Sequence, residues 1–260
     1  MIIGVFDSGI GGLSVLHLAL RRIPGARFLY YADEAHVPYG ERTPEEIVSF
    51  TDEAISFLVD QGAQAVLVAC NTATSAAIRQ LRQKYDLPLI GMEPAVKKAV
   101  DTYPGQRSLV AATPVTLRGE KLRELIRRVD RQHVTDFLPL PELVRFAESG
   151  EFDSPAVEDY LRCKLESFAL PEYAALVLGC THFNYFKDSF RRLLPDTVHL
   201  LDGNAGTVRQ LLVSTQFLTP ETVPGDRVRF YSSGTPVTDT TALERLTGLM
   251  ARLDKMLEIE

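Results

Sequence analysis

Short apolar runs alternate with amphipathic helical patterns along most of the 260-residue chain. A strand that is apolar throughout is buried on both faces, which is typical of a parallel sheet covered by helices on both sides. We therefore predict an α/β fold with mostly parallel sheets. The predicted strands are IIGVF (2–6), RFLYY (27–31), AVLVA (65–69), LPLIG (87–91), SLVAA (108–112), HVTDFLPL (133–140), AALVL (174–178), TVHLL (197–201) and VRFYS (228–232).

Two of the predicted helices begin with clear capping signals. In the first, Thr43 stands at the N-cap, Pro44 at the first helical position, and Glu46 completes a capping box. The second begins in the same way with Ser154 and Pro155. Apolar residues at helical spacing follow both starts, which predicts that one face of each helix packs on a sheet.

Charge and composition narrow the class of protein. The formal net charge is −6 and no basic cluster is longer than two residues, which argues against an electrostatic surface for nucleic acid. The chain reaches Asp7 before any apolar stretch could form a signal peptide, and no run approaches the ~18 apolar residues of a membrane span. We therefore expect a cytoplasmic protein that binds neither nucleic acid nor membrane.

Two of the three cysteines stand in a repeated pattern. Cys70 ends the run AVLVA, and Cys180 follows AALVL, with a small polar residue and a helical pattern after each. The odd number of cysteines and the lack of a C-x-x-C motif argue against a disulfide framework, a zinc ribbon or a thioredoxin-type site. The repeat instead predicts two similar α/β lobes whose thiols face each other across a cleft, because ligands bind beyond the carboxyl ends of parallel strands.

A thiol at a helix N-terminus is suited to acid–base chemistry. Unpaired N–H groups and the helix dipole lower the pKa of a thiol from ~8.5 toward neutrality, so that it can gain or lose a proton near pH 7. A single buried cysteine is better interpreted as packing, whereas two at matching junctions favour function. Cys163 lies in the middle of a predicted helix, where we expect it only to pack.

Further candidate site residues lie beside the strand ends. Asp7 and Ser8 close the first strand and precede the turn GIGG, whose N–H groups could approach an anion, although the phosphate-loop pattern is incomplete. For Asp7, a carboxylate near the reacting centre and a helix N-cap are about equally good interpretations. His182 follows Cys180 by two residues, where an imidazole either holds a thiolate or caps the helix.

Four motifs together closely resemble those of the glutamate racemases: FDSGIGG (6–12), VPYGER (37–42), ACNTATSA (69–76) and LGCTHF (178–183). Glutamate racemases are bacterial enzymes that make D-glutamate for peptidoglycan without a cofactor. The resemblance continues through LLDGNAG (200–206) to YSSGTP (231–236) and so covers almost the whole chain. The paired cysteine motifs are specific for the wider aspartate/glutamate racemase group, and the DSG and PYG motifs narrow it to the glutamate branch.

The resemblance implies a role for each matched residue. Cys70 and Cys180 would be the two acid–base thiols, with Asp7 and His182 assisting them in catalysis. No metal and no cofactor are implied. The residues that would line the substrate site are Asp7, Ser8, Tyr39, Gly40, Asn71, Thr72, Glu148, Thr181 and His182.

The resemblance also implies how the chain is organised. It would form two similar α/β domains with the active site in the cleft between them, and it would assemble as a homodimer. Residues 1–96 and 205–260 would make the first domain, and residues 97–204 the second. Racemisation of L-glutamate by such an enzyme would serve cell wall biogenesis and cell shape.

Two other kinds of function stay open. One is an aspartate racemase or another enzyme of the same superfamily, which assays with both amino acids would distinguish. The other is a non-catalytic amino-acid-binding protein with two α/β lobes, which would bind substrate without exchanging its α-proton. A thiol redox protein is a third alternative, and the lack of C-x-x-C counts against it.

Overall fold

The computed structural model describes residues 1–216, 218 and 226–259, and its strands fall into two sheets. The strands are β1 (Ile2–Asp7), β2 (Arg27–Ala32), β3 (Ala65–Val68), β4 (Leu89–Gly91), β5 (Arg107–Ala112), β6 (Thr135–Pro139), β7 (Tyr173–Leu178), β8 (His199–Asp202), β9 (Val228–Ser232) and β10 (Thr235–Pro236). One sheet has the order β10-β9-β2-β1-β3-β4 and the other the order β6-β5-β7-β8.

The pairing within the sheets is almost entirely parallel. In the larger sheet β1 pairs with β2 and β3, and in the smaller sheet β7 pairs with β5 and β8, all in parallel. Among the described strands only β10 runs antiparallel, against β9. The predicted α/β class with mostly parallel sheets is therefore confirmed, and each of the predicted strands is present.

Helices cover both sheets, and their starts follow the capping signals. Thr43 Oγ1 accepts from the N–H of Glu46 (3.2 Å) and the N–H of Thr43 donates to Glu46 Oε2 (2.8 Å), which confirms the capping box. Ser154 Oγ accepts from the N–H of Val157 (3.3 Å). The α-helices and 3₁₀ helices (η) are α1 (Leu13–Arg22), η1 (Tyr39–Glu41), α2 (Pro44–Asp60), α3 (Asn71–Lys84), α4 (Val96–Thr102), α5 (Pro114–Arg118), α6 (Glu120–Val129), α7 (Glu142–Glu148), α8 (Pro155–Leu165), η2 (Leu170–Glu172), η3 (Thr181–Phe186), α9 (Lys187–Leu193), α10 (Asn204–Thr215) and α11 (Thr240–Met256).

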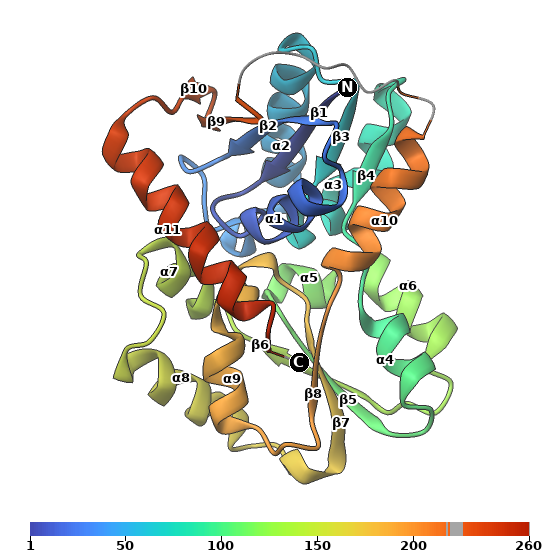
Figure 1. The fold of residues 1–260 in the computed structure, drawn as a ribbon. Helices are drawn as coiled ribbons and strands as arrows, with labels where there is room; N and C mark the ends of the chain where they lie inside the picture. The colour runs from blue at the N-terminus through green and yellow to red at the C-terminus, as the bar shows by residue number, and fades with distance from the viewer. Residues whose placement is uncertain (217, 219–225, 260) are drawn as a thin grey trace.

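Each sheet lies in a lobe of its own (Figure 1). The chain passes from the larger sheet to the smaller one between β4 and α4, and it returns through α10 after β8. The last helix, α11, then runs from the first lobe toward the second and contacts both α1 and η3 (Figure 1). Two lobes are thus present, while the domain limits 1–96 plus 205–260 and 97–204 stay a prediction.

The buried strands set the position of the site. The central strands β1, β3, β5 and β7 are almost completely buried, and a polar residue or a cysteine stands within two residues of the end of each. Because the carboxyl ends of parallel strands meet at one edge of a sheet, these residues gather at one end of each lobe. The side chains named from the sequence lie mostly in these connections.

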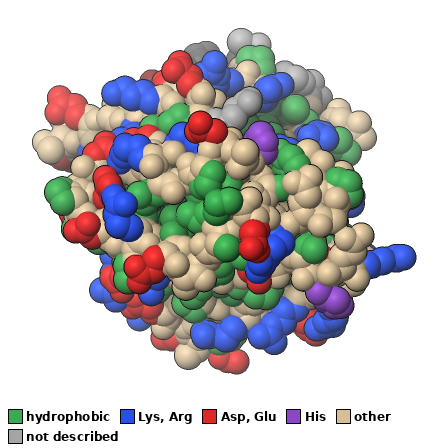
Figure 2. Space-filling view, turned by 90° about the horizontal axis from the view of Figure 1, so that it is seen from below, with side chains coloured by type: hydrophobic (Ala, Val, Ile, Leu, Met, Phe, Trp, Pro, Cys, Tyr) green, Lys and Arg blue, Asp and Glu red, His purple; other side chains and the backbone are tan. Residues whose placement is uncertain are grey.

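The surface carries charges of both signs. Figure 2 shows basic and acidic side chains interspersed over the face that it draws. Among the described residues, no helix has the length and apolar character needed to cross a membrane. 

The capping box of α2 gives the first prediction. Replacing Thr43 by Ala removes the side-chain acceptor at the helix N-terminus and should cost about 1 kcal/mol of stability. For a chain of this size the melting temperature should fall by about 2–4 °C, measured by circular dichroism. Ser49→Ala is the matched control, because it removes an exposed hydroxyl from the same helix without uncapping it. An equal loss in both variants would contradict the assignment.

Candidate active site

Cys70 lies at the junction of β3 and α3, where it is the N-cap of the helix. Its Sγ accepts a hydrogen bond from the N–H of Ala73 (3.4 Å), and the Ser8 hydroxyl lies 3.5 Å from the same sulfur. Only 4% of Cys70 is exposed. The predicted strand–helix junction is therefore present at this cysteine.

The protonation of Cys70 differs from the expectation based on the helix N-terminus. Burial, followed by the nearby Asp7 carboxylate, raises the pKa of Cys70 to about 12. The hydrogen bonds from Ala73 and Ser8 favour the thiolate, but they do not offset the loss of water. The prediction of a pKa near neutrality is thus wrong for Cys70 in this structure, and the group is a neutral thiol at pH 7.

Cys180 occupies the matching place in the second lobe, with one difference. It follows β7 and is 5% exposed, but the next six residues form the 3₁₀ helix η3, and the α-helix α9 begins only at Lys187. Its sulfur makes no capping bond and instead lies 3.7 Å from His182 Nδ1. The two thiols thus have similar positions and different partners.

His182 connects Cys180 to Glu148. Its Nε2 lies 2.6 Å from Glu148 Oε1, and both His182 and this contact are shielded from solvent. Burial opposes protonation of the imidazole, but the hydrogen bonds to Cys180 and Glu148 outweigh it and hold the pKa of His182 well above its ordinary value. The shift favours the protonated imidazole, which lies between the Cys180 sulfur and the Glu148 side chain.

Asp7 joins the two lobes at the end of β1. It is completely buried, its Oδ1 accepts from the N–H of Gly9 (2.9 Å), and its Oδ2 accepts from Thr181 Oγ1 (3.1 Å). Burial raises the pKa of Asp7, against the influence of His182 and the Gly9 N–H. The N-cap interpretation is wrong, because α1 is capped by Gly12 without a side-chain hydrogen bond.

The glycine turn after Asp7 is closed by side chains of the second lobe. A Cβ on Gly9 would lie 1.9 Å from Glu148 Oε1, and a Cβ on Gly11 would lie 2.4 Å from His182 Nδ1. The N–H of Ile10 donates to Glu148 Oε1 (2.9 Å). Glycine is needed here for close approach, and the acceptor of this loop N–H is the protein's own carboxylate rather than a phosphate.

Tyr39 and Gly40 belong to a loop that reaches the second lobe. The Tyr39 hydroxyl donates to Asp33 Oδ2 (2.7 Å), and burial together with this carboxylate raises the pKa of Tyr39. A Cβ on Gly40 would lie 3.1 Å from the Cβ of Thr113, which follows β5. The phenol is thus fixed as a donor, and the loop backbone passes close to the opposite lobe.

Thr72 belongs to a cluster of hydroxyls that the sequence analysis did not identify. Its Oγ1 lies 3.0 Å from that of Thr113 and 3.3 Å from that of Thr116, so that α3 and α5 contact each other across the lobes. Thr113 directly follows the predicted strand SLVAA and precedes Pro114, the same start signal as at Thr43. This signal at a strand end could have identified the cluster.

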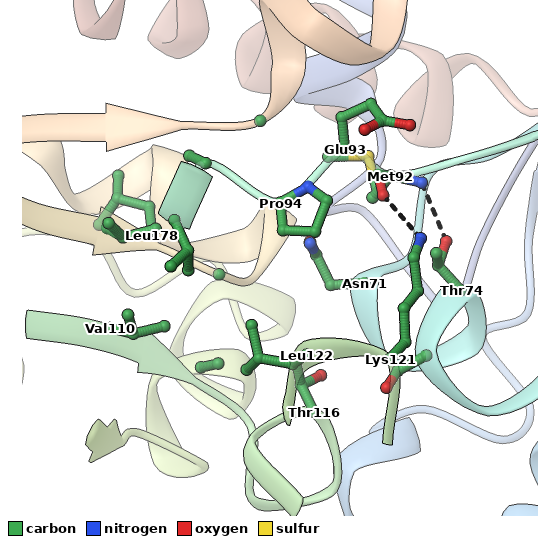
Figure 3. A pocket seen from close by; sticks show the side chains of 17 residues that line it. Asn71, Thr74, Met92, Glu93, Pro94, Val110, Thr116, Lys121, Leu122 and Leu178 are labelled. Atoms are coloured by element: carbon green, nitrogen blue, oxygen red, sulfur yellow. Dashed lines mark hydrogen bonds between the residues drawn. The ribbon is translucent and has the colours of Figure 1, made fainter. Parts of the chain in front are cut away.

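Asn71 lines a cavity between the lobes, and so does Thr116 of this cluster (Figure 3). The walls include Met92, Val110 and Leu122, and neither thiol lines them. Lys121 Nζ donates to the Met92 carbonyl (3.1 Å), and burial lowers the pKa of Lys121 to about 8. The buried Asn71 Oδ1 has no hydrogen-bond partner among the described residues.

Cys163 lies apart from these groups. The sequence analysis expects it to pack beside the apolar face of its helix, but the structure shows an exposed, free cysteine on α8. The helix buries Val157, Leu161 and Leu165, and Cys163 falls between two of them on the outward side. The packing prediction is therefore wrong.

Two lobes with mostly parallel sheets, each with a buried cysteine beyond a matching strand end, place the protein in the class of α/β proteins with one cysteine in each lobe. Residues 14–211 match the family model described as Asp/Glu/Hydantoin racemase, and the chain belongs to this family. Among the described residues, no group of three or more His, Cys, Asp or Glu side chains is arranged to hold a metal ion.

Comparison with individual proteins supports the same family. A glutamate racemase of Campylobacter curvus is 52% identical over the full length of both chains, and one of Lachnospira eligens is 49% identical with the same coverage. The structure resembles Escherichia coli glutamate racemase in complex with L-glutamate and the activator UDP-MurNAc-Ala, with a TM-score of 0.84 and 27% identity over 97% of this chain and 94% of that one. It also resembles the Thermus thermophilus glutamate racemase (TM-score 0.72, 32% identity, coverage 99% and 94%).

The difference in burial between Cys163 and Cys70 predicts the order in which an alkylating reagent labels them. With iodoacetamide at pH 7.5 and no added amino acid, exposed Cys163 should be alkylated before Cys70. As long as the pH stays below the pKa of Cys70, its labelling rate should rise about tenfold for each unit of increase in pH, because only the thiolate reacts. Peptide mapping by mass spectrometry measures both rates, and Cys163→Ser removes the fast label as a control. Faster labelling of Cys70 at neutral pH would contradict the raised pKa.

Proposed function

We propose that the protein interconverts L-glutamate and D-glutamate, with Cys70 and Cys180 as the acid and the base. The observation that carries this proposal is the pair of buried thiols at equivalent strand ends of two lobes. Full-length relatives that are about half identical and are named glutamate racemase support the substrate.

The reaction needs one proton acceptor and one proton donor on opposite faces of the α-carbon. One cysteine, as thiolate, removes the α-proton and leaves the electron pair on the carbon. The other cysteine, as thiol, donates its proton to the opposite face and becomes the thiolate. For the mirror-image substrate the roles exchange, which is why two groups of the same kind suit a racemase.

The two thiols have different neighbours, and these neighbours affect the thiolate of each cysteine differently. Protonated His182 beside Cys180 stabilises a thiolate by charge and hydrogen bonding. Cys70 has Ser8 as a hydrogen-bonding neighbour and lies near Asp7. Cys70 becomes a thiolate when its proton passes to the nearby Asp7 carboxylate, whose own pKa is raised by burial, and the ammonium group of the bound amino acid stabilises the negative charge left on the sulfur.

The substrate site in this proposal comprises the residues implied by the resemblance. Thr113 and Thr116 extend it, because they bond to Thr72 from the second lobe. Backbone N–H groups at the strand–helix junctions would hold the carboxylates and stabilise the carbanionic charge. The proposed binding side chains and backbone positions are Asp7, Ser8, Tyr39, Gly40, Asn71, Thr72, Glu148, Thr181 and His182.

The wider role follows from the family rather than from the geometry. In this proposal the enzyme acts in the cytoplasm, as a homodimer and without a cofactor, and supplies D-glutamate for peptidoglycan and hence for cell wall and cell shape. Size-exclusion chromatography with light scattering tests the dimer. A monomer at assay concentration would contradict it.

The cysteine pair gives the sharpest prediction. Cys70→Ala and Cys180→Ala should each abolish racemisation of both enantiomers, because every turnover needs both groups. A positioned acid or base contributes ~10²–10⁴-fold, so the loss should be at least of this size. Circular dichroism of L- and D-glutamate measures the rate, and calorimetry measures binding, which should largely persist.

Cys163→Ala is the matched control and should leave the rate unchanged, because its thiol is exposed on α8. In D₂O the native enzyme should place deuterium in the product enantiomer. Near-native activity of either site variant would refute the two-thiol mechanism. Binding of glutamate without any deuterium uptake by the native protein would instead favour an amino-acid-binding protein.

The choice of substrate is tested separately. We expect kcat/KM for glutamate to exceed that for aspartate by more than a factor of ~10, because the longer side chain must reach carboxylate donors that the shorter one leaves unpaired. Both rates are measured by circular dichroism with purified enzyme and no additions. A higher value with aspartate would overturn the proposed substrate while leaving the thiol pair intact.

A further inference from the structure

We propose that Arg252 on α11 is a positioning residue for racemisation, which holds the His182–Glu148 pair in the orientation that Cys180 requires. The inference rests on the proposed function of Cys180. It starts from α11, which follows β10 of the first lobe and runs onto η3 of the second (Figure 1). The element that α11 contacts there, η3, is the segment that carries His182.

A ring of hydrogen bonds surrounds the His182 side chain. His182 Nε2 meets Glu148 Oε1 (2.6 Å), and the same oxygen accepts from the N–H of Ile10 (2.9 Å). The Ile10 carbonyl accepts from the Tyr185 hydroxyl (3.1 Å). Tyr185 belongs to η3, as His182 does, so the backbone of η3 closes the ring. The positions of all groups in the ring therefore depend on the positions of Tyr185 and Glu148.

Two arginines of α11 hold these two residues through their backbone carbonyls. Arg252 Nε donates to the carbonyl of Tyr185 (2.9 Å), and Arg245 Nη2 donates to the carbonyl of Glu148 (2.7 Å). The carbonyl of a residue fixes its backbone, whereas its side chain stays available to the site. One helix thus fixes both ends of the His182–Glu148 contact.

Arg252 is itself fixed on all sides, which allows it to act as an anchor. Its guanidinium nitrogens bond to Asp153 (2.9 Å) and Asp188 (3.0 Å), and its Cζ lies 4.8 Å from the centre of the Phe152 ring. Phe152 in turn stacks on Tyr185, with ring centres 5.2 Å apart. Only 14% of the arginine side chain is exposed, so this network is stronger than a surface ion pair.

The ring and its arginine anchor hold the hydrogen-bonding partner of Cys180 and not the partners of Cys70. The titratable groups that interact with His182 are Cys180, Glu148 and Asp7. The ring fixes Glu148 against Nε2, and so sets the orientation of the imidazole whose Nδ1 faces the Cys180 sulfur (3.7 Å). Cys70 is held by Ala73 and Ser8, which do not belong to the ring. Loss of the anchor should therefore slow the proton transfers of Cys180 and leave ground-state binding near Cys70 unchanged.

The test compares Arg252→Gln with Arg252→Lys and with Arg192→Gln. Arg192 is the matched control, because it also pairs with Asp153 (3.7 Å) but makes no bond to Tyr185. We expect kcat of Arg252→Gln to fall by ~10–100-fold in both directions, as for a small displacement of a catalytic group. KM should change less than kcat, because most of the proposed binding groups lie outside the His182–Glu148 pair. Arg252→Lys should recover part of kcat, and Arg192→Gln should match the native enzyme.

A second readout does not depend on activity. The imidazole of His182 is titrated by NMR, with its signal assigned by loss in His182→Gln. In Arg252→Gln, but not in Arg192→Gln, the pKa of His182 should move toward its ordinary value, because the bonds to Cys180 and Glu148 loosen. If Arg252→Gln fails to fold, Tyr185→Phe removes only the bond to the Ile10 carbonyl and should give the same change.

The outcomes separate the two proposals. If the native protein does not racemise glutamate, the proposed function fails, and the His182 titration alone decides whether Arg252 positions the pair. If the native protein is active, equal kcat and equal His182 titration in Arg252→Gln and Arg192→Gln overturn the positioning role. A rise in KM with unchanged kcat would also overturn it, because that result indicates substrate binding rather than positioning.

Discussion

A carboxylate that is completely buried holds the arrangement of the site together. Asp7 ends the central strand of the larger sheet, and a buried carboxylate is costly unless hydrogen bonds replace the lost water. One partner is its own turn, through Gly9, and the other is Thr181 of the opposite lobe. Because Thr181 directly follows Cys180, satisfying Asp7 also determines how the second thiol lies relative to the first lobe.

The two halves of the site are alike in backbone and unlike in electrostatics. Both thiols follow buried parallel strands, but Cys70 caps an α-helix and Cys180 begins a 3₁₀ segment. The tighter turn places His182 beside the sulfur, where it pairs with Glu148. A reaction that runs in both directions can use such unequal groups, because each direction needs one proton donor and one proton acceptor and the two cysteines exchange these roles.

Much of the fold and part of the site could be predicted from the sequence, for physical reasons. Apolar runs predicted every strand except β10, whose two residues, Thr235 and Pro236, are exposed and carry no burial pattern. The positions of the two buried thiols could be predicted from the ends of the apolar strands. The pKa of Cys70 could not be predicted, because desolvation depends on the atoms that surround the sulfur in the folded protein. Cys163 was misplaced because the sequence analysis put it beside the apolar face, whereas at ~100° per residue it falls on the side of α8 opposite to the buried Val157, Leu161 and Leu165.

The burial that raises the pKa of Cys70 has two consequences for the proposed reaction. It makes the thiolate scarce before substrate binds, and it makes that thiolate a stronger base once it forms, because basicity rises with pKa. An α-proton needs a strong base, whereas a free thiolate at neutral pKa would be plentiful but weak. In the proposed reaction, the charge of the substrate ammonium therefore stabilises the thiolate when substrate binds, and the α-proton is the next proton that the thiolate can take. In the empty site the neutral thiol is protected from oxidation and alkylation, since both need the thiolate.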